Sequence, residues 1–107
     1  CAITLPAPTD GDHIKLVLGA VTSNNHVITS DASTTLYTGY SLMEDTADAT
    51  AAQHVVFAPD GSDDRILTMN GTTTGISGVI CLTGVSNNKW LVEGRLTASG
   101  TVATPFS

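Results

Sequence analysis

Three histidines are the first residues to consider for chemistry, because imidazole nitrogens bind metals and transfer protons near neutral pH. They are His13, His26 and His54. Their spacings do not match zinc sites, in which pairs of ligands stand only a few residues apart. Each histidine also begins a segment with strand character, where a half-exposed imidazole is common. We therefore expect surface histidines and no metal centre.

The segment Asp60-Gly61-Ser62-Asp63-Asp64 brings three carboxylates close together in sequence and has some likeness to a calcium-binding loop. It lacks the alternation of ligands that ends in a bidentate Glu. Asp and Gly in this order are also typical of a tight turn. The sequence favours an acidic turn here and at Asp10-Gly11-Asp12, with weak surface binding of calcium as the alternative.

Nucleophilic catalysis needs a nucleophile, a base beside it and a third group that orients the base. Ser77 lies in Gly75-Ile76-Ser77-Gly78, which is one residue short of the Gly-x-Ser-x-Gly elbow of hydrolases. No helical pattern follows it. The glycine-rich segment 71–78 also contains no Lys with which to hold a phosphate. We expect no cofactor at this segment.

Pairs of carboxylates are the other common catalytic arrangement. The chain contains Asp63 beside Asp64 and Glu44 beside Asp45. Adjacent residues on a strand point to opposite faces, so we expect that neither pair converges on a substrate bond. No catalytic residue is predicted, and we expect that the protein is not an enzyme.

The composition indicates which elements must position these residues. The chain has 107 residues, enough for one domain, 1–107, with one modest core. Hydrophobic residues make up 41% and charged residues 13% of the chain. Threonine is abundant while Lys, Glu and Leu are few, which disfavours helices and favours strands. The composition predicts an all-β fold.

The net charge of −6 and the scarcity of basic residues argue against a nucleic-acid partner. The four basic residues are Lys15, Arg65, Lys89 and Arg95, too few to form a cationic stripe. The apolar runs are far shorter than the roughly 20 residues that cross a bilayer. The start also lacks the features of a signal peptide. We expect a soluble protein with no membrane contact.

Short segments with strand character are bounded by Gly, Pro, Asp or Asn along the whole chain. A strand at 13–18, a turn-rich loop at 19–25 and a strand at 27–28 predict one hairpin. A similar hairpin is predicted from 79–82 and 89–93. The fold class predicted from this pattern is a compact antiparallel β-sandwich or small barrel of about seven to nine short strands. The remaining strands are expected at 3–5, 35–40, 54–57 and 64–68.

Residues 44–53 are acidic and rich in alanine, but they contain little apolar surface that a helix could bury. We interpret them as an exposed excursion with at most one helical turn.

The cysteines, Cys1 and Cys81, are too few for a zinc cluster. They are interpreted as free thiols, with a disulfide from the first strand to a late strand as the alternative.

Trp90 shares a strand face with Val92, which favours core or intersubunit packing over a sugar-binding platform. The Pro105-Phe106 pair near the C-terminus is typical of an anchor for a tail, and we predict that Phe106 packs against a neighbouring subunit or a larger assembly. A core built mostly of small aliphatic residues leaves little net stability in a domain of this size. Oligomerisation would add buried apolar area and so raise this stability.

Several pieces of the sequence, taken in order, resemble one family of proteins. They are the start Thr4-Leu5-Pro6-Ala7-Pro8, the strand Gly11-Asp12-His13-Ile14-Lys15-Leu16, Asn24-Asn25-His26-Val27-Ile28, Leu42-Met43-Glu44-Asp45, Asn70-Gly71-Thr72-Thr73-Thr74-Gly75, the segment around Trp90, and the tail 98–107. This order resembles the small β-domain virion proteins of tailed bacteriophages, especially marine and cyanobacterial ones. Members of that family occur as capsid decoration (cement) proteins and as modules of tail appendages.

The resemblance implies a viral structural protein that binds the outside of a tailed-phage head and stabilises the shell. The implied partners are the major capsid protein and two further copies of the chain in a homotrimer. The implied location is the outer capsid surface of the virion, with the host cytoplasm during assembly. Segments 1–8 and 95–107 are expected to be arms that contact other subunits or the capsid. The candidate protein-interaction residues are Ile3, Leu5, Pro6, Trp90, Pro105 and Phe106.

Two alternatives remain open. The same β-trimer could be a tail-fibre, tail-spike or receptor-binding module that presents the loops at Ser62 and Asn87 to a host surface. A bacterial adhesin domain of prophage origin is the third interpretation. Related chains carry more strand sequence before Ile3, and this chain begins at Cys1 without a methionine, so we expect a processed product or a fragment.

Overall fold

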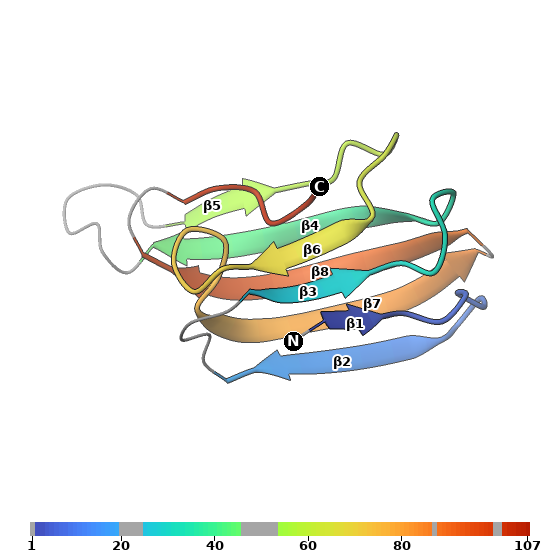
Figure 1. The fold of residues 1–107 in the computed structure, drawn as a ribbon, viewed down its shortest axis with the longest axis horizontal. Helices are drawn as coiled ribbons and strands as arrows, with labels where there is room; N and C mark the ends of the chain where they lie inside the picture. Colours follow the sequence, from blue (N-terminus) through green and yellow to red (C-terminus); the bar gives the residue numbers. More distant parts are fainter. Residues whose placement is uncertain (1, 20–24, 46–53, 87, 100–101) are drawn as a thin grey trace.

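Eight β-strands and no helix make up the described part of the chain, which is residues 2–19, 25–45, 54–86, 88–99 and 102–107 of a computed structural model. The all-β prediction is confirmed. The strands, shown in Figure 1, are β1 (Ala2–Thr4), β2 (His13–Leu18), β3 (His26–Thr29), β4 (Leu36–Asp45), β5 (His54–Phe57), β6 (Ile66–Met69), β7 (Ser77–Ser86) and β8 (Lys89–Ala98).

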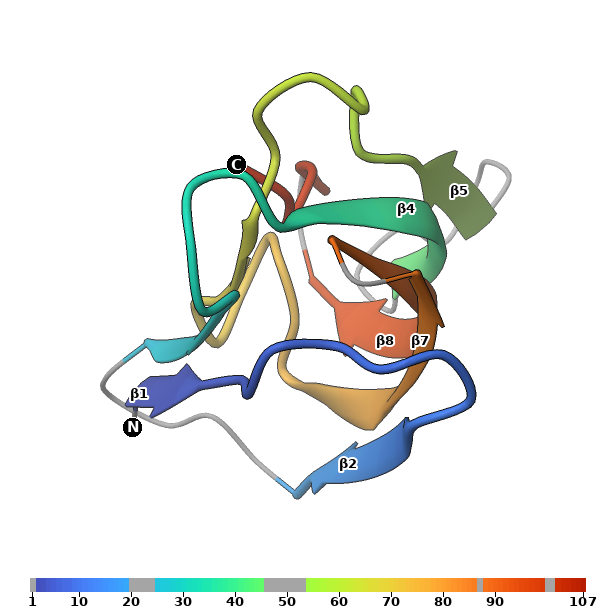
Figure 2. The same ribbon diagram turned by 90° about the vertical axis from the view of Figure 1, so that its right-hand side faces the viewer.

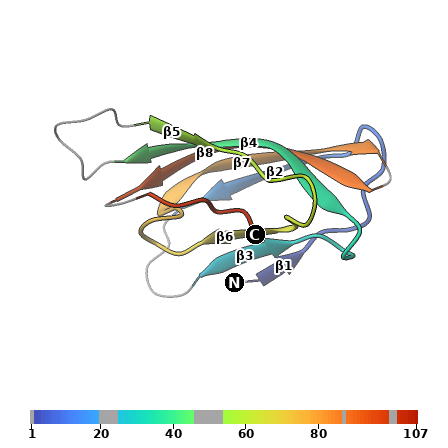
Figure 3. The same ribbon diagram turned by 90° about the horizontal axis from the view of Figure 1, so that it is seen from above.

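The strands form two separate sheets, which are seen in cross-section in Figure 2 and as two layers in Figure 3. One sheet has three strands in the order β1-β3-β6, and the other has five in the order β2-β7-β8-β4-β5. One core cluster draws on both sheets, from Ile28 and Leu67 in the smaller to Leu82 and Val92 in the larger. Of the two predicted architectures, the structure has the sandwich-like one.

Two strand pairs are parallel, which corrects the expectation of a purely antiparallel fold. Strand β1 pairs in parallel with β3, and β4 pairs in parallel with β8 over ten residues, from Leu36 beside Lys89 to Asp45 beside Ala98. Strands β4, β7 and β8 each have ten residues and are longer than the short strands expected. Alternation of side chains marks a strand but carries no information about the direction of its neighbour.

Of the two predicted hairpins, the structure contains the second. Strands β7 and β8 pair in antiparallel fashion, with a register shift between Gly84 and Ser86. The first hairpin prediction was wrong, because β2 pairs with β7 in the larger sheet while β3 lies between β1 and β6 in the smaller one. Polar turn residues between two strands are compatible with a connection from one sheet to the other as well as with a tight hairpin turn within one sheet. Most of that connection, residues 20–24, lies outside the described residues.

Strand boundaries also differ from the predicted ones near the acidic segments. Strand β4 continues to Asp45, so the start of the predicted excursion at 44–53 belongs to a strand, and residues 46–53 lie outside the described part. Strand β6 begins at Ile66, two residues after the predicted start at Asp64.

The core is lined by the inward-facing residues of the long strands. Along β8 the buried positions alternate with outward ones, so Trp90, Val92, Leu96 and Ala98 all face the smaller sheet. Trp90 has no exposed surface, so of the two predicted roles, core packing and intersubunit packing, the structure has core packing. The core also contains both methionines and three of the five aromatic residues, which supply bulk that the small aliphatic residues lack.

Gly39 allows β4 to lie against β8 in this register. Its backbone has a φ of 103°, and a Cβ built on it would overlap the carbonyl oxygen of Val92. Any other residue at this position would strain the backbone and push the two strands apart.

Candidate functional site

Four of the six candidate interaction residues lie inside the protein's own core. Leu5 is 3% exposed, Phe106 is 4% exposed and Trp90 is fully buried, while Pro105 is among the fully buried side chains. A side chain covered by its own chain is not available to a neighbour in this conformation, so the predicted external contact of Phe106 is corrected. The two candidates on the surface are Ile3, which is 38% exposed, and Pro6.

The C-terminal residues are not a free arm but an added strand on the edge of β6. The amide of Thr68 donates to the carbonyl of Pro105 at 2.9 Å, and the amide of Ser107 donates to the carbonyl of Ile66 at 2.9 Å. Phe106 forms an antiparallel bridge with Leu67. The expected arm at 95–107 therefore consists of the end of β8, which is part of the larger sheet, and of this docked tail, while residues 100–101 lie outside the described residues.

Tyr37 connects this tail to the small sheet. Its ring meets that of Phe106 edge-on, with the centroids 6.4 Å apart. Its hydroxyl donates a hydrogen bond of 2.9 Å to the backbone carbonyl of Ile28 on β3. Burial raises the pKa of the Tyr37 phenol well above its ordinary value near 10, although the charge of Arg65 opposes the shift. The phenol is therefore a permanent donor at physiological pH.

The N-terminal segment differs from the tail because most of it is exposed. In the described part of the chain, β1 pairs on one side only, with β3, and its three residues are all exposed. Leu5 is the anchor, since its side chain is buried and its amide donates to the carbonyl of Thr29 at 2.8 Å. We call the unpaired side of β1 together with Pro6 the N-terminal edge.

An apolar cleft of about 270 Å³ lies beside the N-terminal edge. Ile3 lines it from β1 and Leu16 and Leu18 line it from β2, while Met69 and Ile80 form part of its floor. Both β1 and β2 are edge strands, one of each sheet, so the cleft opens where the sandwich is not closed by a further strand. The opening has the size and chemistry to take an apolar side chain from another protein.

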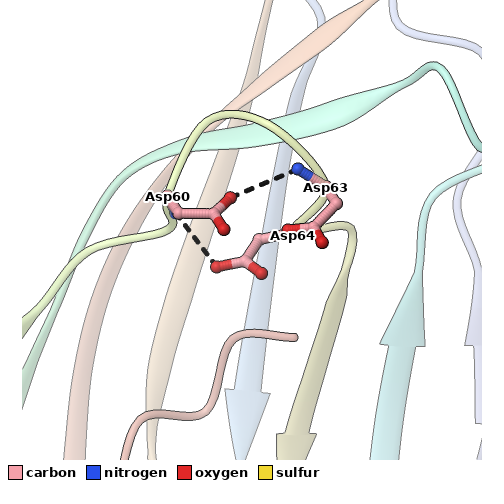
Figure 4. Close-up of side chains that lie close together, drawn as sticks. All are labelled: Asp60, Asp63 and Asp64. Atoms are coloured by element: carbon pink, nitrogen blue, oxygen red, sulfur yellow. Dashed lines mark hydrogen bonds between the residues drawn. The ribbon is translucent and has the colours of Figure 1, made fainter.

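The acidic turn brings together carboxylates that the sequence predicted to diverge. Asp60, Asp63 and Asp64 each place a carboxylate oxygen within 4.8 Å of the others (Figure 4). The prediction for Asp63 and Asp64 was wrong because both lie in the turn before β6, where the alternation of a strand does not apply.

Hydrogen bonds within the acidic turn explain its geometry. The Asp60 carboxylate accepts from the amides of Ser62, at 2.9 Å, and Asp63, at 3.2 Å. These amides lower the pKa of Asp60 to about 2, whereas hydrogen bonding with Asp60 and its negative charge raise the pKa of Asp63. Asp60 and Asp63 are exposed, and the turn's own amides already donate to one oxygen of the Asp60 carboxylate. Its geometry is that of an acidic turn.

The other residues considered for chemistry lie apart from one another. His13, His26 and His54 begin β2, β3 and β5, as predicted, which places them on both edges of the larger sheet and in the middle of the smaller one. Ser77 begins β7. Cys81 is a half-buried thiol in the middle of β7, and the disulfide alternative stays a prediction because Cys1 lies outside the described residues.

Two buried polar groups lack a hydrogen-bond partner among the described residues. They are the hydroxyl of Ser41 on β4 and the indole N–H of Trp90 on β8. An unpaired polar group inside a core costs roughly 1–3 kcal/mol. These groups are the least satisfied part of the interior, and no sequence pattern distinguishes them from paired ones.

The sequence did not single out the exposed face of the larger sheet, where four apolar side chains and one arginine form a row. Strand pairing aligns Val17, Val79, Arg95, Leu42 and Val56 across all five strands. Val17 is 72% exposed and Val56 is 62% exposed. We call this set the valine row, and the surface that carries it, which points away from the smaller sheet, the outer sheet face (Figure 2). Each strand contributes only one member, so the row exists only through the register.

No protein-family model, curated protein or solved structure matches this chain. The described residues also contain no helix of the length and apolarity that a membrane span requires.

Proposed function

We propose that this protein is a capsid decoration protein of a tailed bacteriophage, which binds the outer surface of the head and stabilises the shell. The order of sequence pieces that resembles such proteins and the all-β fold with two sheets support the proposal. Its mechanism would be the burial of an interface on the shell. The observation that carries it is the N-terminal edge, the side of β1 that has no partner strand in the described part of the chain, with an exposed Ile3 beside an apolar cleft.

An unpaired strand edge is a natural place for contact with another chain. Its free amides and carbonyls can pair with an extended segment, while a neighbouring pocket takes a side chain and gives specificity. Here the edge is short, so backbone pairing alone would be weak, and the cleft next to it supplies apolar area. We propose that a segment of the major capsid protein adds to β1 and inserts an apolar side chain into the cleft.

Binding of this kind stabilises a shell by mass action. A protein that binds only the assembled shell contributes RT ln(1 + [L]/Kd), which is about 2.7 kcal/mol per site at a hundred times Kd. A homotrimer would engage three sites at once and gain avidity from effective concentration. We propose the threefold assembly as part of the decoration role, because three simultaneous contacts compensate for a small individual interface.

The N-terminal edge can be tested on the particle with a matched pair of variants. Ile3→Asp introduces a charge at the proposed contact, and Val85→Asp introduces the same charge at the end of β7, where the native side chain has nearly the same exposure, 40% against 38%. We expect that Ile3→Asp raises the dissociation constant for isolated heads at least about tenfold, which corresponds to about 1.4 kcal/mol, while Val85→Asp binds like the native protein. Equal binding by both variants would remove the N-terminal edge from the contact, and binding to tails instead of heads would favour the receptor-binding alternative.

A further inference from the structure

We infer that the outer sheet face binds a second copy of this chain, face to face across a two-fold axis. This two-fold contact is separate from the N-terminal edge and from the proposed threefold assembly, and it does not depend on where the protein is located. Three observations carry it: the valine row, a second row of residues beside it on the same face, and the distribution of charge over the molecule.

The outer sheet face carries a second row next to the valine row. Register aligns Lys15, Cys81, Glu93 and Tyr40 across β2, β7, β8 and β4. Tyr40 is 40% exposed, and a shallow depression of about 300 Å³ lies between the two rows. We call this set the mixed row. Because its members stand two residues from those of the valine row along each strand, the rows are about 7 Å apart.

The two rows are complementary to each other when one copy is turned over onto another. A two-fold axis that lies in the face, across the strands and between the rows, places the mixed row of one copy on the valine row of the other. Glu93 then faces Arg95 of the second copy, and the symmetry repeats this pair. Tyr40 likewise faces Leu42, and Cys81 faces Val79. Two apolar contacts and the two Glu93–Arg95 pairs therefore lie at the centre, the aliphatic part of Lys15 packs on Val17, and Val56 has no counterpart because the mixed row ends at β4.

The charge of the whole chain leaves few surfaces on which two copies can meet. Each copy has a net charge of −6, so most approaches are repulsive. The outer sheet face is the exception, since three of the four basic residues, Lys15, Lys89 and Arg95, lie on it with only Glu44 and Glu93 as acidic residues among its described side chains. The carboxylates of the acidic turn lie off this face, in the connection between β5 and β6.

The available area is sufficient for a specific but modest contact. Strands of six, ten, ten, ten and four residues, about 4.8 Å apart and with a rise of about 3.3 Å per residue, give a face of roughly 600 Å². Two such faces bury at most about 1,200 Å², the lower end of specific protein interfaces, because some strand ends extend beyond the overlap. Aligned packing of two sheets, with their strands about 30° apart, is the ordinary geometry for surfaces of this kind.

The test is a charge exchange measured by sedimentation equilibrium over a range of concentrations. Arg95→Glu puts like charges opposite each other twice, so we expect at least about a tenfold increase in the dissociation constant and a halved assembly mass at moderate concentration. Glu93→Arg combined with Arg95→Glu restores opposite charges and should restore the native mass. Lys89→Glu is the control, because it makes the same change in charge on the same strand beyond the overlap of the two copies.

Tyr40→Glu provides a second variant in case Arg95→Glu does not fold, which circular dichroism would show. It places a charge against Leu42 of the other copy and should also halve the mass. A native protein with the mass of one or of three chains at every concentration, or an assembly that Arg95→Glu and Tyr40→Glu leave intact, would overturn the inference. Failure of the double exchange to restore the mass of Arg95→Glu would overturn it as well.

Discussion

The two ends of the chain, both expected to be arms, differ in what they contact. The C-terminal end places Phe106 and Pro105 in the core and hydrogen bonds its backbone to β6. The N-terminal end has one buried anchor, Leu5, and an exposed strand before it. The difference shows that an apolar residue near a terminus can pack in the chain's own core or stay available to a partner. Its burial in the folded chain distinguishes these two roles. It leaves the N-terminal edge as the end available for contact.

The largest effect is expected from Phe106→Ala. Removal of the ring leaves a cavity beside Tyr37 and Leu67 and should lower the free energy of unfolding by about 3–5 kcal/mol. Urea denaturation of the isolated protein measures this directly. A loss below about 1 kcal/mol would mean that the tail is not part of the core, and would return Phe106 to the role of an external contact.

Leu5→Ala tests where the anchored part of the N-terminal segment begins. Leu5 is buried as deeply as Phe106 but has a smaller side chain, so we expect a loss of about 2–4 kcal/mol in the same denaturation experiment. Hydrogen exchange of the β1 amides should also become faster in this variant, because Leu5 holds β1 against β3. Unchanged stability would show that the whole segment is detachable, and would widen the contrast between the two ends.

Tyr37→Phe separates the contact that Tyr37 makes with the C-terminal tail from the one that it makes with β3. The ring and its packing on Phe106 remain, but the hydrogen bond to the carbonyl of Ile28 is lost, at a cost of about 1 kcal/mol. Burial raises the pKa of this phenol above its unfolded value, so its contribution to stability is complete below pH about 10 and decreases as the pH rises further. The native protein should therefore lose more stability than Tyr37→Phe between pH 9 and pH 11. Parallel losses in both proteins would contradict the buried, hydrogen-bonded phenol.

Ile3→Ala should have the smallest effect on the fold. The side chain is 38% exposed and lies on an edge strand, so we expect a change within about 0.5 kcal/mol. Stability of the isolated domain, measured beside Phe106→Ala, checks this. A loss of several kcal/mol would show that Ile3 belongs to the core and would weaken its assignment to a contact with the shell.

The sequence predicted the features that depend on local pattern. The starts of β2, β3 and β5 were predicted to within one residue from short apolar segments that follow a histidine, and the β7–β8 hairpin follows from two apolar segments joined by Asn and Ser. The core position of Trp90 follows from the face that it shares with Val92. Each of these inferences needs only residues that are close together in sequence.

The features that the sequence missed depend on partners that are far apart in sequence. The loop after β2 has the same turn residues as the loop after β7, yet it joins two sheets, because β7 pairs with β2 on one side and with β8 on the other. The Pro105-Phe106 pair indicated an anchor but not its destination, which is set by Tyr37 and Leu67. The valine row likewise has one residue per strand and becomes visible only when the register of all five strands is known.

The most direct test of the decoration role is cryo-electron microscopy of the tailed-phage particle that carries this protein, with heads and tails averaged separately. We predict density for many copies over the shell, with the N-terminal edge facing the major capsid protein and the C-terminal tail folded onto β6. Density confined to the tail or its fibres, or a shell contact made by residues 102–107 in place of the N-terminal edge, would contradict the proposal.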